Sequence, residues 1–178
     1  MKNILLFAFL TFITGNAQTK YLTKTGEIRF EASVPSFEEV AAKNNTATAI
    51  LDLESGEFAA LVLIKGFRFK NALMEEHFNE NYAESEKYPK ATFKGQLEEF
   101  ETASLKTSYT LTGKLTFHGV TNTLEVKNVS LTKNGDSYEL SGRFVTYPAD
   151  FAISIPKIVR NKIADSVTVF FTFTMIAK

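Results

Sequence analysis

Alternation of apolar and polar residues with a period of two runs through most of the chain after residue 17. In residues 27–34 ("EIRFEASV") the apolar residues occupy the even positions, and in residues 105–117 and 166–175 they occupy mainly the odd positions. Such alternation is typical of strands with one buried face and one face in water. Shorter runs at residues 47–53, 57–69, 91–100, 123–131 and 138–147 bring the predicted number of strands to about eight.

Turn residues separate these runs. Ser55-Gly56 and Asn134-Gly135-Asp136 have the composition of hairpin turns. Proline, which cannot donate to a strand ladder, lies outside or at the ends of the runs. The four prolines are Pro35, Pro89, Pro148 and Pro156. The chain is therefore predicted to be all-β with antiparallel hairpin connections.

Two details concern the shape of the sheet. The apolar residues stand at even positions in residues 124–126 but at odd positions in residues 129–131. This shift by one position predicts a bulge near Asn128. Glycine also occurs inside three predicted strands, at Gly95, Gly113 and Gly142. Glycine in a strand is compatible with strong bending of the sheet or with close approach of another group. Such bending favours a closed eight-stranded antiparallel barrel over the alternative, a sandwich.

Two segments depart from the strand pattern. Residues 71–82 ("NALMEEHFNENY") predict one short helix between strands, with Leu73, Met74 and Phe78 on one side. Residues 149–164 form an apolar and basic connection that could hold a helical turn.

The first seventeen residues have the features of a secretory signal peptide. Lys2 precedes an apolar run at residues 4–13, which is too short to span a membrane, and small residues follow up to Ala17. We predict cleavage between Ala17 and Gln18, which leaves residues 18–178 as one exported domain, periplasmic or secreted. The alternative is a membrane anchor that stays on the protein.

Composition narrows the function. The 20 basic and 20 acidic residues balance and form no basic stripe, which argues against nucleic acid as a partner. The chain has no Cys, so it has neither a disulfide nor a thiolate. After residue 17 no apolar run approaches the length of a membrane-spanning helix, so we do not expect an integral membrane protein.

Catalytic and metal-binding motifs are absent from the sequence. There is no G-x-S-x-G nucleophile turn, no glycine-rich phosphate loop and no H-E-x-x-H zinc motif. His77 and His118 are the only histidines, and without Cys they make a poor zinc site. We therefore expect no catalysis, no metal and no cofactor.

Several motifs together indicate a family. The segment "ALMEEHFNENYAESEKYPKATFKG" and the later "LTGKLTFHGVTNTLEV" contain "KYPxxxF" and "HGVT", and residues 144–156 read "FVTYPADFAISIP". In order and spacing these elements resemble the YceI-like, polyisoprenoid-binding family. The resemblance implies a lipocalin-like eight-stranded barrel that holds a long isoprenoid, either a polyprenyl phosphate or the tail of a quinone. It also implies export to the bacterial periplasm and, since members are often dimeric, raises the option of a homodimer.

The sequence departs from the family pattern at two places. The early glycine-aromatic element is replaced by "EEVAAKNNTATAI", and Met74 and Glu75 stand where the family often has arginine and aspartate. The missing arginine removes a cationic contact to a phosphate and favours a neutral head group.

The candidate binding residues follow from the alternation of inward and outward side chains along the predicted strands and from the family motifs. The predicted cavity walls are Phe67, Phe69, Phe93, Leu115, Phe117, Phe144, Phe171 and Phe173. Ligand access is predicted near residues 73–88 and 151–155, with Leu73, Met74, Phe78, Tyr82, Tyr88, Phe151 and Ile153 in contact with the lipid. The helical segment is either a lid over the cavity or an ordinary plug of the barrel end.

The two histidines are placed at the predicted cavity mouth. His118 ends a strand and precedes Gly119, so we favour a turn histidine that holds the corner over a head-group contact. His77 lies on the short helix. Either histidine could serve as a base if the protein were instead a lipid-modifying enzyme.

The predicted function is non-catalytic binding, transport or storage of a long-chain isoprenoid lipid. Burial of flat aromatic side chains in an ordinary packed core is the simplest alternative, because 17 − 3 = 14 of the phenylalanines follow residue 17. A small outer-membrane barrel is a further alternative. It would need an apolar outer face and aromatic girdles, and the chain contains no Trp.

Overall fold

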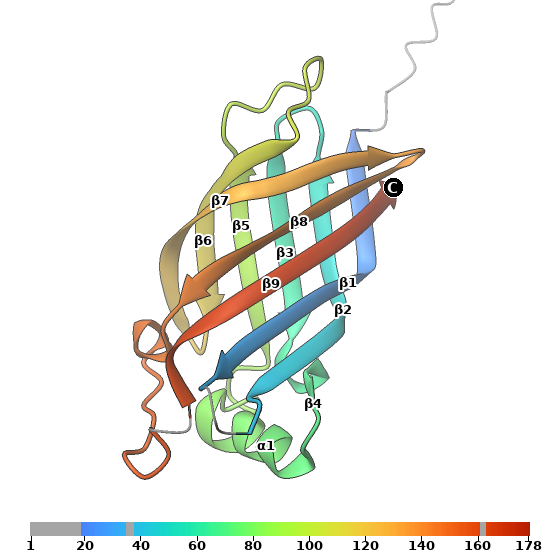
Figure 1. Cartoon of the computed structure of the whole chain (residues 1–178). Helices are drawn as coiled ribbons and strands as arrows, with labels where there is room; N and C mark the ends of the chain where they lie inside the picture. The colour runs from blue at the N-terminus through green and yellow to red at the C-terminus, as the bar shows by residue number, and fades with distance from the viewer. Residues whose placement is uncertain (1–18, 35–37, 161–162) are drawn as a thin grey trace, which may run out of the picture.

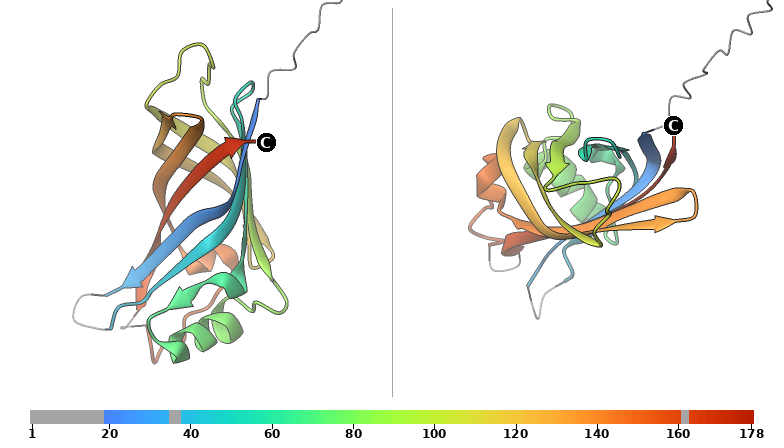
Figure 2. Two further views of the ribbon diagram at one scale, coloured as in Figure 1. Left: turned by 90° about the vertical axis from the view of Figure 1, so that its right-hand side faces the viewer. Right: turned by 90° about the horizontal axis from the view of Figure 1, so that it is seen from above.

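The computed structural model describes residues 19–34, 38–160 and 163–178; the predicted signal peptide lies outside these residues. In the described residues, eight long antiparallel strands close into a barrel (Figures 1 and 2). They are β1 (Lys20–Ser33), β2 (Ala41–Asp52), β3 (Glu57–Leu63), β5 (Lys90–Leu97), β6 (Ser108–Phe117), β7 (Val120–Asn134), β8 (Ser137–Thr146) and β9 (Ile163–Ala177). The order around the barrel is β1-β9-β8-β7-β6-β5-β3-β2, and β1 also pairs with β2, which closes the ring.

The strand count and the bulge are confirmed, with one correction. Residues 57–69 are not one strand, because the 3-10 turn η1 (Ile64–Gly66) separates β3 from the two-residue β4 (Arg68–Phe69). The bulge lies where predicted: Tyr109 pairs with Val129 but Leu111 pairs with Val126, which leaves one extra residue on β7. Asn128 takes a positive φ of 57° there, a conformation that Asn tolerates better than most residues.

The predicted helix is also present, and it crosses one end of the barrel (Figure 1). It consists of α1 (Ala72–His77) and the π-helical turn η2 (Phe78–Tyr82). The Asn71 side chain caps it by accepting a hydrogen bond from the Leu73 backbone N–H at 2.9 Å. The connection between β8 and β9 contains the 3-10 turn η3 (Pro148–Phe151).

The end of the barrel opposite α1 lies near the C-terminus (Figure 1), and it contains fully buried apolar side chains. We call this the packed end and define it by Leu51, Leu97, Leu140 and Met175, which are all at most 1% exposed. The opposite end, bounded by α1, η2, η3 and the β6–β7 turn, is called the open end.

The outward face carries a row of polar side chains across three strands. On neighbouring strands β5, β6 and β7, Lys94 pairs with Lys114 and Lys114 with Thr123. An outer-membrane barrel has the reverse arrangement, with apolar side chains directed outward. Among the described residues, no helix is both long enough and apolar enough to cross a bilayer.

Candidate ligand-binding cavity

A cavity of about 570 Å³ fills the barrel from its middle to the open end. This volume lies within the range of small-molecule sites in proteins. The structure places thirteen of the fifteen predicted lipid-contacting residues in its lining: Phe67, Phe69, Met74, Phe78, Tyr82, Phe93, Leu115, Phe117, Phe144, Phe151, Ile153, Phe171 and Phe173.

Leu73 and Tyr88 lie outside the cavity lining. Leu73 is 57% exposed, because Met74 and Phe78 are one helical turn apart and face the barrel, and the neighbour of Met74 must point elsewhere. Tyr88 instead packs edge-on against the His118 ring, with centroids 4.5 Å apart. The prediction that all of Leu73, Met74 and Phe78 lie on one side of the helix is therefore wrong for Leu73.

Four phenylalanines join the helical segment to the barrel. The Phe78 ring lies 5.4, 5.9 and 5.3 Å from the rings of Phe30, Phe67 and Phe69, which belong to β1, the η1–β4 turn and β4. Tilted and edge-on contacts at these distances stabilise an aromatic cluster beyond simple burial. The helical segment is thus held at the open end by the same side chains that line the cavity.

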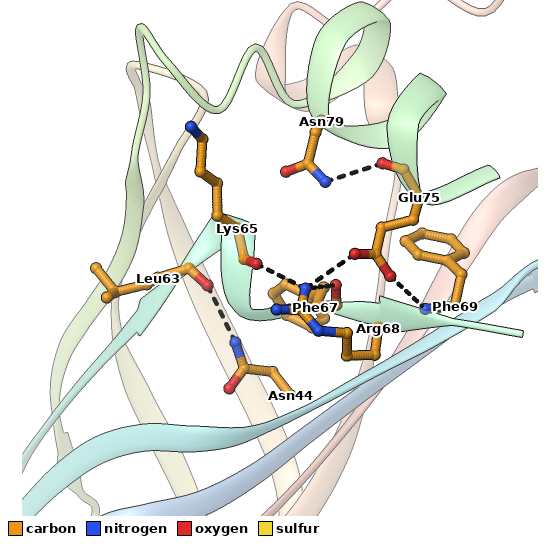
Figure 3. Close-up of polar contacts among 8 residues, drawn as sticks. All are labelled: Asn44, Leu63, Lys65, Phe67, Arg68, Phe69, Glu75 and Asn79. Carbon is orange, nitrogen blue, oxygen red and sulfur yellow. Dashed lines mark hydrogen bonds and ion pairs between the residues drawn. The ribbon is translucent and has the colours of Figure 1, made fainter. Parts of the chain in front are cut away.

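Glu75 forms the polar counterpart of this cluster (Figure 3). Its carboxylate accepts hydrogen bonds from Arg68 Nη1 at 2.9 Å and from the Phe69 backbone N–H at 3.1 Å. The Glu75 backbone carbonyl accepts from Asn79 Nδ2 at 2.8 Å. These bonds tie α1 to β4, so Glu75 has a structural role at a position where the family often carries aspartate.

Asn44 secures the chain on the other side of η1 (Figure 3). It is 1% exposed, and its Nδ2 donates to the Leu63 carbonyl at 3.0 Å. Its Oδ1 accepts from the Thr46 backbone N–H at 2.8 Å. A buried amide with both ends satisfied fixes the backbone around it, and here it fixes the turn that carries Phe67 into the cavity.

His118 holds a corner of the open end. It takes a positive φ of 48° in the β6–β7 turn, and its side chain is 10% exposed. Its Nδ1 donates to the Phe151 carbonyl at 2.9 Å, since a carbonyl can only accept, and its Nε2 lies 2.6 Å from Glu84 Oε2. The ring therefore joins three segments and lies outside the cavity lining, whereas His77 lies within it.

The cavity lining carries very little charge. Its ionisable side chains, apart from tyrosines, are Glu38 and His77, and among the described lining residues there is no Lys or Arg. Glu38 Oε1 accepts from Asn71 Nδ2 at 3.1 Å. Within the described residues, no three His, Asp or Glu side chains are grouped so that they could hold a metal ion. The site is suited to an apolar tail with a neutral polar group at the open end.

Several lining residues were missed from the sequence. Ile28, Phe30 and Ala60 face the cavity, and the clear alternation of residues 27–34 could have identified the first two. Phe58 has the opposite sequence parity to Phe67, so it could not be assigned while residues 57–69 were treated as one strand.

Comparison with known proteins gives the same fold. A polyisoprenoid-binding domain from Saccharophagus degradans, implicated in plant cell wall breakdown, is 14% identical, with a TM-score of 0.74 over 91% of this chain and 100% of that chain. BcnA of Burkholderia cenocepacia is 17% identical, with a TM-score of 0.72 over 86% and 96%. The Campylobacter jejuni YCEI protein is 16% identical, with a TM-score of 0.63 over 100% and 99%. These identities support the fold alone.

The comparison with curated proteins found no match. The family comparison is decisive, because the YceI-like domain matches residues 16–175, which is nearly the whole chain. It agrees with the resemblance carried by the "KYPxxxF" and "HGVT" motifs. The chain therefore belongs to the YceI-like family.

Proposed function

We propose that this protein binds a long-chain isoprenoid lipid, with the tail inside the barrel and the head at the open end, and carries or stores it without chemical change. The apolar cavity that opens at one end of the barrel is the observation that supports this function. Each methylene moved from water into such a cavity contributes about 0.8 kcal/mol. A prenyl tail can therefore bind tightly with few polar contacts. The name of the Saccharophagus degradans relative, a polyisoprenoid-binding domain, agrees with this proposal.

The proposed head group is neutral, as in an isoprenoid quinone. A phosphate would find no Lys or Arg among the described lining residues, and it would face the Glu38 carboxylate. His77, Tyr82 and Tyr147 line the cavity and can form hydrogen bonds with a carbonyl or hydroxyl group. The proposal includes export to the periplasm or beyond, which the leader features of residues 1–17 support, and it leaves a homodimer as an option.

Organic extraction of the purified protein, followed by mass spectrometry, tests the proposal. We expect a prenyl lipid, unchanged in mass after prolonged incubation with the protein. Modification of the lipid that disappears in His77→Ala would instead support the enzymatic alternative. Binding of a prenylated quinone should exceed binding of a polyprenyl phosphate of equal chain length by about tenfold or more, because burying an unpaired phosphate is unfavourable.

Two adjacent alanines on β3 provide a matched pair for locating the ligand. Ala60 lines the cavity, whereas its neighbour Ala59 belongs to the outward face of the strand. Ala60→Phe should fill the cavity and abolish quinone binding, while Ala59→Phe should leave binding unchanged. Equal binding by both folded variants would place the ligand outside the barrel and contradict the proposed function.

A further inference from the structure

Three phenylalanines form a layer across the barrel where the cavity ends. The Phe58 and Phe173 rings lie 5.5 Å apart, although they come from β3 and β9, which are not neighbours in the sheet. The Phe171 ring stacks on Phe173, with centroids 5.7 Å apart and an interplanar angle of 25°. All three line the cavity and yet are at most 8% exposed. We call Phe58, Phe171 and Phe173 the aromatic floor.

Glycines hold two of these rings in place. A Cβ on Gly26 would lie 2.3 Å from Phe173 Cδ1, and a Cβ on Gly142 would lie 2.8 Å from Phe171 Cζ. Carbon atoms in contact are normally 3.5–4.0 Å apart. The rings of Phe173 and Phe171 therefore contact the backbone of these glycines directly, so they cannot shift further towards the barrel wall.

Fully buried leucines adjoin the aromatic floor outside the cavity lining. Leu51 is the cross-strand partner of Phe58, and Leu140 is the cross-strand partner of Phe173. Both leucines are 0% exposed and neither lines the cavity. A ligand tail that reaches the floor would have to displace the close-packed side chains of the packed end to go further, and such interiors resist displacement.

We infer that the aromatic floor limits the length of isoprenoid tail that the barrel accepts. This inference rests on the proposed function. A tail that enters from the open end can extend inward only as far as the floor, so isoprene units beyond that length remain outside the barrel.

Dissociation constants for prenyl alcohols of two to six isoprene units test this limit. Burial of two methylenes already strengthens binding about tenfold. Affinity for the wild-type protein should therefore rise at least about tenfold with each unit up to a limiting length within this series and then level off. Phe58→Ala removes six ring carbons, about one isoprene unit, and should lengthen the limit by one unit. The alcohol one unit longer than the wild-type limit should then bind this variant at least about tenfold more tightly than it binds the wild-type protein.

Phe144→Ala is the matched control. Phe144 lines the same cavity on β8 but lies one inward position beyond Gly142 towards the open end, so its loss widens the cavity without deepening it. Circular dichroism checks folding, and Phe58→Leu replaces Phe58→Ala if the alanine variant does not fold. An unchanged limit in Phe144→Ala supports the floor.

Each remaining result has a separate meaning. Affinity that keeps rising through six units in the wild-type protein would overturn the length limit but leave lipid binding intact. An equal shift of the limit in Phe144→Ala would show that total volume, not the floor, sets the length. Failure of every alcohol to bind the wild-type protein, together with an empty lipid extract, would overturn the proposed function itself.

Discussion

The packed end and the open end are built from the same strands but use their inward side chains differently. At the packed end, aliphatic side chains such as Leu51, Leu140 and Met175 meet in the middle and are at most 1% exposed. At the open end, Leu115 and Phe144 face a cavity and are only partly buried. Burial of apolar surface stabilises the fold wherever it occurs. Stability is therefore concentrated at one end of the barrel, and the other end is left free to hold a ligand.

The largest expected effect comes from truncating one leucine at each end. Leu140→Ala should lower the free energy of unfolding by about 2–5 kcal/mol, because it leaves a void in a close-packed region. Leu115→Ala should lower it by clearly less, because its side chain already borders a cavity. Urea denaturation of the two variants measures the difference. Equal losses of unfolding free energy would mean that the two ends contribute alike to stability, which would contradict the difference described here.

A smaller effect is expected at the corner of the open end. His118→Ala removes the hydrogen bond to the Phe151 carbonyl and the contact with Glu84, which should lower the free energy of unfolding by about 1–3 kcal/mol. Amide hydrogen exchange should accelerate near residues 84 and 151 and stay unchanged at the packed end. His77→Ala is the control, since the His77 side chain is exposed and its loss should leave stability nearly unchanged. Uniformly faster exchange would show that the two ends unfold as one unit.

The smallest effect concerns one surface ion pair at each end. A hydrogen bond from Lys70 lowers the pKa of Glu39 at the open end, and a hydrogen bond from Lys106 lowers the pKa of Glu99 at the opposite end. Because the folded pKa is depressed, each pair stabilises the fold above the unfolded pKa, and this contribution is lost as pH falls through the folded pKa. Both pairs are exposed, so salt should weaken them.

NMR titration of the wild-type protein, Lys70→Ala and Lys106→Ala measures these shifts. Each substitution should return the pKa of its own partner to the ordinary range and leave the other carboxylate unchanged. A carboxylate that titrates in its ordinary range in the wild-type protein would contradict the corresponding pair. A change in both carboxylates after one substitution would show that the ends are electrostatically coupled.

Much of the fold could be predicted from residue patterns. In any barrel, a strand with one buried and one solvent-exposed face alternates apolar and polar residues with a period of two. The slip of parity around Asn128 identified the bulge for the same reason. The break at η1 could not be seen, because residues 57–69 are apolar enough to read as one strand. Because of that break, Phe58 at an even position and Phe67 at an odd position both face the cavity.

The candidate site could be predicted only in part. Parity tells which side chains point inward, and it therefore placed Phe93 and Phe144 correctly in the cavity lining. Parity does not tell whether inward side chains meet or leave space, because that depends on how the tilted strands converge. The packed end and the aromatic floor are consequences of this three-dimensional packing, and no local motif indicates either of them.

The closure of the ring through β1 has a consequence for the order of assembly. Ile28 on β1 pairs with Phe171 on β9, partners that are 171 − 28 = 143 positions apart. Until β9 docks, the other long strands can form only an open sheet whose edges are β1 and β8. Unpaired edges of this kind recruit other strands and promote aggregation. Docking of β9 removes both edges in one step, and the same step supplies Val169 and Phe171 to the cavity. A chain clipped before β9 would therefore lose its binding site and its protection from aggregation together.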